Sequence, residues 1–103
     1  MEFKEFVKKA KEIKEKYCRI NPKPWGVAEY TQGFAGDVGD LMKLMMAKNE
    51  FRTIENVEEK LAHELSDCLW SILVIADELG IDLEREFMNQ MDALKERIDR
   101  MHR

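Results

Sequence analysis

The chain has 103 residues, with 17 Lys and Arg against 21 Asp and Glu and a formal net charge of −4. This length suits a single domain, residues 1–103, and the mixed charge without a dense basic block argues against a nucleic-acid duplex or an anionic membrane as partner. The chain opens on a charged amphipathic segment, which is untypical of a signal peptide, and has no apolar run of the roughly 20 residues that a membrane span needs. Two widely separated cysteines, Cys18 and Cys68, suit free thiols in a reducing compartment. We therefore expect a soluble, cytoplasmic protein.

Apolar spacing predicts an all-α protein with four helices and no strand. The first helix covers residues 3–20, where apolar residues recur every three or four positions until the segment 21–24 (Asn-Pro-Lys-Pro) stops it. The second runs from about residue 25 to residue 47 and carries one apolar face. Because the breaks between helices are short, we expect a four-helix bundle-like subunit.

The third helix should begin near Asn56, where Asn56 and Glu59 fit the spacing of a capping box, and end at Gly80. Its second half is apolar almost all round, so we expect it to be central and covered by its own chain or by a partner subunit. The fourth helix should begin at Asp82 as its N-cap. Its apolar residues repeat at coiled-coil spacing, at Phe87, Met91, Leu94, Ile98 and Met101.

Two acidic pairs lie in apolar surroundings, Asp37 with Asp40 in the second helix and Glu64 with Asp67 in the third. Residues three apart share a helix face, so each pair sets two carboxylates side by side. The repulsion between them costs free energy that a hard cation such as Mg²⁺ would remove. Acidic pairs elsewhere in the chain sit among lysines and arginines, as ordinary surface charge does. Two interpretations stay open, a shared metal site and two solvated acidic patches.

Three glycines, Gly33, Gly36 and Gly39, stand beside the first acidic pair. Each costs about 1 kcal/mol relative to alanine in a helix interior, so three together indicate that something approaches the bare backbone closely. We expect tight helix–helix packing, room for a ligand, or both.

These motifs resemble those of the MazG-like, all-α nucleoside triphosphate pyrophosphohydrolases. Segment 36–41 (Gly-Asp-Val-Gly-Asp-Leu) is similar to the family's Gly-Glu-Val-Gly-Glu-Leu, and segment 64–70 (Glu-Leu-Ser-Asp-Cys-Leu-Trp) resembles its second motif, Glu-x-x-Asp. The turn at 79–83 (Leu-Gly-Ile-Asp-Leu) continues the likeness, which covers roughly residues 25–95.

The resemblance implies a helical subunit that pairs into a homodimer or a dimer of dimers, with Asp37, Asp40, Glu64 and Asp67 as catalytic ligands of Mg²⁺, or of Mn²⁺ in its place. It also implies hydrolysis of an NTP or a dNTP to the monophosphate and pyrophosphate, with a role in cleaning the nucleotide pool. A triphosphate carries about four negative charges, so bound metal ions would screen it, activate a water and stabilise the leaving pyrophosphate.

The chain departs from the family pattern at its first motif, which normally reads Glu-x-x-Glu where this chain has Asp37 and Asp40. The shorter side chains require closer helices or bridging waters to complete octahedral Mg²⁺ coordination. The last helix also lacks the family's Lys-Met-x-x-x-Asn stretch. The second departure means that substrate choice does not transfer from the family. The two aspartates of the first motif favour an alternative, a catalytically inactive helical dimer that acts as a nucleotide-binding or protein-binding module.

Six further residues are candidates for substrate contact. Phosphate contacts are expected from Lys43, Lys48, Arg52 and Lys60, and base stacking from Trp25 and Trp70. The alternative for each cation is surface charge, and for Trp70 it is a place in the core. Trp25 is the favoured stacking residue because it follows Pro24 in a setting that should be exposed.

Overall fold

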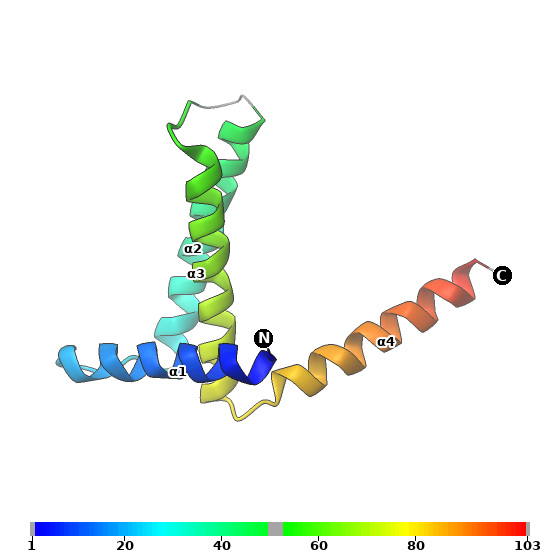
Figure 1. The fold of residues 1–103 in the computed structure, drawn as a ribbon, viewed down its shortest axis with the longest axis horizontal. Coiled ribbons are helices and arrows are strands. Elements are labelled where there is room, and N and C mark those ends of the chain that lie inside the picture. The colour runs from blue at the N-terminus through cyan, green and yellow to red at the C-terminus, as the bar shows by residue number, and fades with distance from the viewer. Residues whose placement is uncertain (1, 50–52, 103) are drawn as a thin grey trace.

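The computed structural model describes residues 2–49 and 53–102, which form the four helices in Figure 1: α1 (Phe3–Ile20), α2 (Val27–Lys48), α3 (Val57–Glu78) and α4 (Leu83–Met101). No strand occurs within these two ranges, so the all-α prediction is confirmed. The helix bounds lie within about two residues of the predicted ones. Cys18 and Cys68 are both free thiols, as expected.

Helices α2 and α3 run antiparallel and pack along their length, while α1 lies across one end of this pair and contacts α3 (Figure 1). The core sits at this crossing and is built from Ala10, Tyr30, Leu73 and Val74, of which Val74 is fully buried. The small side chain of Ala10 lets α1 approach the pair closely. The predicted central position of the second half of α3 is therefore confirmed on the side that faces α1 and α2.

Polar contacts of Lys14 and of Trp70 hold α1 against α3. Lys14 Nζ lies 2.8 Å from Asp77 Oδ2 and 2.9 Å from Glu78 Oε1. Burial alone would lower the pKa of Lys14, but the hydrogen bonds to Asp77 and Glu78 outweigh it and raise that pKa. The same hydrogen bond lowers the pKa of Asp77. The second contact is a 3.2 Å hydrogen bond from Trp70 Nε1 to the carbonyl oxygen of Ala10.

The turn between α3 and α4 forms as predicted. Gly80 has a φ of +67°, and the Ile81 N–H donates a 2.9 Å hydrogen bond to the carbonyl oxygen of Ala76, which ends α3 in a Schellman motif. Asp82 Oδ1 accepts a 3.2 Å hydrogen bond from the backbone N–H of Arg85 and so caps α4.

The capping box predicted at the start of α3 was wrong. Asn56 is the N-cap residue, but its backbone is left-handed, with a φ of 55°, and its side chain makes no capping hydrogen bond. A capping side chain reaches the second or third N–H of the helix from an extended backbone, and a left-handed residue points its side chain elsewhere.

Helix α4 extends away from the other three helices (Figure 1), and none of its residues is buried. The radius of gyration is 16.9 Å, whereas a compact chain of this length has about 13 Å. Because α4 extends away from the other helices, a four-helix bundle would have to include a helix of a second chain. The bundle therefore stays a prediction. None of the described helices is long and apolar enough to cross a membrane.

Candidate functional site

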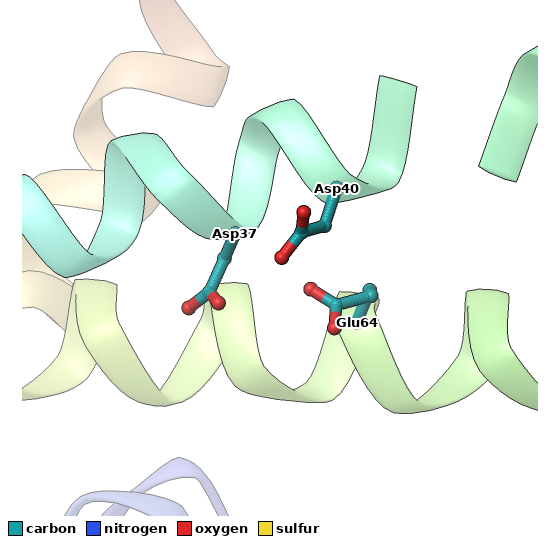
Figure 2. A group of neighbouring side chains, drawn as sticks. All are labelled: Asp37, Asp40 and Glu64. Atoms are coloured by element: carbon teal, nitrogen blue, oxygen red, sulfur yellow. The ribbon is translucent and has the colours of Figure 1, made fainter. Parts of the chain in front are cut away.

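Three of the four predicted metal ligands meet between α2 and α3. Asp37 and Asp40 project from one face of α2 because they are three residues apart, and Glu64 projects from α3 toward them (Figure 2). Each offers one carboxylate oxygen, and these oxygens all lie within 4.8 Å of one another. Asp40 is exposed, whereas Asp37 and Glu64 are half-buried, so the group opens to solvent on one side.

The carboxylate group is electrostatically unfavourable in the absence of a cation. Burial raises the pKa of Asp37, and the charges of Asp67 and Asp40 raise it further. Burial also raises the pKa of Glu64, with added repulsion from Asp37 and Asp40. In addition, the Oε2 atom of Glu64 is buried and has no hydrogen-bond partner among the described residues.

These residues fit a divalent metal ion. The donors are carboxylate oxygens alone, which hard cations prefer, and the open side leaves room for the waters that Mg²⁺ retains. A cation at this point would also give the buried Glu64 Oε2 the partner that it lacks.

The fourth predicted ligand, Asp67, does not join this group. Its Oδ2 atom lies 3.2 Å from His63 Nε2, one turn earlier on α3, and its side chain is 46% exposed. It is nevertheless close enough for its charge to raise the pKa of Asp37. His63 was not among the predicted site residues, and its i, i+4 spacing to Asp67 is the sequence signal for this contact.

An aromatic pocket of about 580 Å³ begins beside the carboxylates. Asp37 and Asp67 line one part of it, and both predicted tryptophans line another. Its remaining lining is Ile13, Tyr17, Cys18, Asn21 and Tyr30. The sequence interpretation therefore found the tryptophans but missed the wall that α1 supplies, because periodicity does not show which helices cross.

Edge-to-face contacts organise the aromatic side of this pocket. The ring centroids of Trp25 and Tyr30 lie 5.6 Å apart at an interplanar angle of 65°, and those of Tyr30 and Trp70 lie 5.9 Å apart at 79°. Tyr17 adds an edge contact to Trp70 at 6.1 Å. Trp25 is 48% exposed, so part of its ring is free for a ligand, whereas Trp70 is anchored to α1.

A smaller hollow of about 310 Å³ lies beside the carboxylates and is lined in part by Asp40, Glu64, Lys43 and Lys60. Both lysines were predicted to contact phosphate, and the structure brings them next to the acidic residues. Lys48 does not line either space and instead pairs with Glu58. Arg52, the remaining predicted phosphate contact, lies outside the described residues.

The glycines of α2 differ in their surroundings. A Cβ at Gly33 would lie 3.4 Å from the ring of Trp25, so the bare backbone there lets that ring approach α2. At Gly36 and Gly39 an added Cβ would meet no described atom within 4 Å. Tight helix–helix packing, one of the two uses expected of these glycines, is therefore not found at Gly36 and Gly39 among the described residues.

Comparisons with protein-family models, with curated proteins and with solved structures find no match for this chain.

Proposed function

We propose that the protein is a cytoplasmic, Mg²⁺-dependent nucleoside triphosphate pyrophosphohydrolase of the MazG-like type, which converts an NTP or a dNTP to the monophosphate and pyrophosphate. One observation carries the proposal: the carboxylate group of Asp37, Asp40 and Glu64 lies between an aromatic pocket and a hollow with two lysines. This arrangement suits a ligand with an aromatic part, a chain of anionic groups and metal ions bound between them.

The two spaces suggest how a nucleotide would lie. Trp25 is partly exposed in the aromatic pocket, and a base can stack on its ring. Lys43 and Lys60 line the opposite hollow and would contact the terminal phosphates. The phosphate chain would then cross the carboxylate group, where its own charge of about −4 and the acidic residues could be close only with cations between them.

Asp37, Asp40 and Glu64 would hold the metal, which when bound supplies Lewis-acid activation of water and screening of phosphate charge. Asp67 would orient the attacking water from the rim, with its carboxylate positioned by His63. Hydrolysis by one water of the anhydride between the first and second phosphates gives the monophosphate, pyrophosphate and a proton. Mn²⁺ would replace Mg²⁺ on the same oxygen ligands.

A panel of canonical and modified NTPs and dNTPs, incubated with the protein and Mg²⁺, tests the proposal by chromatographic separation of monophosphate and pyrophosphate. Glu64→Gln should abolish turnover, because it removes a charged ligand. The matched control is Glu59→Gln, which changes an exposed acid on the same helix and should leave turnover unchanged. Turnover that Glu64→Gln retains would contradict the assigned ligands, and no turnover across the panel would contradict the activity.

A second candidate function is a catalytically inactive module that binds nucleotide. It is favoured by the displacement of Asp67, which leaves three ligands rather than four in the carboxylate group. Nucleotide binding without turnover, measured by calorimetry with Mg²⁺ present, would select this candidate.

We also propose that the protein acts as a homodimer or a dimer of dimers. The exposed apolar residues of α3 and α4 support this proposal.

A further inference from the structure

One nitrogen donor lies at the edge of the carboxylate group. His63 directly precedes Glu64 on α3, and with Asp40 and Glu64 it lines the smaller hollow. The carboxylate group itself offers oxygen atoms alone. Oxygen ligands suit Mg²⁺, whereas an imidazole nitrogen favours later transition-metal ions such as Co²⁺, Ni²⁺ and Zn²⁺. The kind of ion that binds here therefore depends on whether His63 takes part.

His63 already lies at ligand distance from an oxygen donor. Its Nε2 atom is 3.2 Å from Asp67 Oδ2, one turn later on α3. Two neighbouring ligands of an ion bound at about 2.1 Å lie about 3.0 Å apart in octahedral coordination and about 3.4 Å apart in tetrahedral coordination. The observed separation falls between these values. One ion can therefore contact both atoms with little movement of either side chain.

The pair of His63 and Asp67 spans the same stretch of α3 as the carboxylate group. His63 lies at the smaller hollow, and Asp67 lines the aromatic pocket together with Asp37. Glu64, which points toward α2 in Figure 2, stands between them in the sequence. A phosphate chain that runs from the pocket to the hollow would pass the pair. Its oxygens could then fill coordination positions that the two side chains leave open.

The exposure of the pair leaves it free to bind an ion. The side chain of His63 is 73% exposed and that of Asp67 is 46% exposed. A contact between side chains this exposed contributes little to folding, because water and salt screen it. Both side chains are also open to an ion and to the waters that it keeps. Folding therefore does not require that the two side chains stay on each other.

We propose that His63 and Asp67 together bind a second metal ion, a later transition metal of the class of Co²⁺, Ni²⁺ and Zn²⁺, beside the ion of the carboxylate group. His63 is not one of the four carboxylate ligands that the family resemblance implies, so it would set a metal preference particular to this chain. The inference deepens the proposed metal site and rests on it. Mg²⁺, which prefers oxygen, would leave His63 in contact with Asp67.

Titration calorimetry with Co²⁺ alone and with Mg²⁺ alone, in the absence of nucleotide, tests the proposal. The wild type should bind Co²⁺ at one site more than it binds Mg²⁺. His63→Ala should weaken Co²⁺ at this extra site by at least the roughly 10–100-fold that the loss of an outer-shell partner costs. The affinity of His63→Ala for Mg²⁺ should equal that of the wild type, because the carboxylate group is unchanged.

His102→Ala is the matched control, because it removes the other histidine of the chain at an exposed position after α4. It should keep the extra Co²⁺ site. The visible absorption of bound Co²⁺, which reports its ligands, should change in His63→Ala and stay the same in His102→Ala. Circular dichroism checks that His63→Ala is folded, as the exposure of His63 predicts.

A second variant tests whether the two residues hold the same ion. Asp67→Asn should weaken Co²⁺ at the extra site, as His63→Ala does. Combining the two changes should cost little more affinity than either change alone, because the first already removes the shared ion. Full additivity of the two losses would mean that His63 and Asp67 act on separate ions, and would overturn the proposal.

Co²⁺ binding that His63→Ala leaves unchanged would overturn the proposal, and so would a wild type that binds Co²⁺ and Mg²⁺ at the same number of sites. In either case Mg²⁺ binding that Glu64→Gln abolishes would still support the carboxylate site and the proposed function. Conversely, Co²⁺ bound at His63 in a protein that hydrolyses no nucleotide would contradict the proposed activity and leave this inference standing. The two failures are therefore distinguishable.

Discussion

Trp70 and Ala10 are joined by a 3.2 Å hydrogen bond from the indole nitrogen to the backbone carbonyl oxygen, which ties α3 to α1. The bond fixes the plane of the Trp70 ring, and that ring forms one wall of the aromatic pocket. Trp25, on the other wall, has no such anchor among the described hydrogen bonds and is half exposed. The two tryptophans should therefore respond differently to substitution.

We predict that Trp70→Phe lowers the free energy of unfolding by about 1–2 kcal/mol, because it removes this hydrogen bond and some buried ring area. Trp25→Ala should cost less stability and weaken nucleotide binding by about 1–3 kcal/mol, the value of one base stacked on an aromatic ring. Urea denaturation and calorimetric titration measure the two effects. This division of roles would be contradicted if the two variants lost the same nucleotide affinity and the same free energy of unfolding.

The ion pair between Lys14 and Asp77 should make stability depend on pH at the acidic end. The hydrogen bond from Lys14 lowers the pKa of Asp77 in the folded state. A lowered carboxyl pKa contributes stability that is present above the unfolded pKa of about 3.9 and is lost as the pH falls through the folded pKa. We therefore predict that Asp77→Asn destabilises the protein by about 1 kcal/mol at pH 7.

At a pH well below 3, where Asp77 is protonated, the difference in melting temperature between Asp77→Asn and the wild type should disappear. Thermal denaturation across pH 2–7 measures it. Glu84→Gln, at an exposed position of α4, is the control and should show no such trend. A destabilisation that stays constant down to the lowest pH would mean that Asp77 acts through packing rather than through its charge.

Glu64 should make the stability of the protein depend on pH in the direction opposite to that of Asp77. Burial and the neighbouring carboxylates raise its pKa, so its ionised form is unfavourable in the folded protein. Stability from such a group is full below the unfolded pKa and is lost as the pH rises through the folded pKa. Without divalent ions, Glu64→Gln should therefore raise the melting temperature at pH 7 by a few degrees, and lowering the pH should shrink this gain.

Saturating Mg²⁺ should reverse this order of melting temperatures, so that the wild type melts above Glu64→Gln. An ion that binds the folded state at 100 times its Kd stabilises it by about 2.7 kcal/mol, so the wild type should melt at a higher temperature with Mg²⁺ while Glu64→Gln should not. Differential scanning calorimetry with EDTA and with Mg²⁺ measures both. A wild-type melting curve that Mg²⁺ does not move would count against a metal at Asp37, Asp40 and Glu64.

Helical period, with the proline, glycine and capping signals, was enough to predict the bounds of the helices and that Asp37 and Asp40 share one face. Spacing alone left open whether Glu64 meets them, and that expectation came from the family resemblance. Helical period also does not show which element covers that face. For this reason the sequence could not indicate that α1 supplies Tyr17 and Cys18 to the aromatic pocket or that α4 leaves the other helices. Asp67 lies outside the carboxylate group and contacts His63 instead, a local contact that helical period could have indicated.

Gly36 and Gly39 offer a last test of what lies against α2. No described atom would be met by a Cβ at either position, so Gly36→Ala should raise the free energy of unfolding by about 0.5–1 kcal/mol through reduced freedom of the unfolded chain and better helix propensity. Gly33→Ala is the matched comparison and should gain less, because its Cβ would touch the ring of Trp25. Chemical denaturation of the three proteins under the same conditions ranks them. If Gly36→Ala instead destabilises the protein or weakens its dimer, another molecule must approach the bare backbone there, and the glycines would then serve an interface that a single chain does not show.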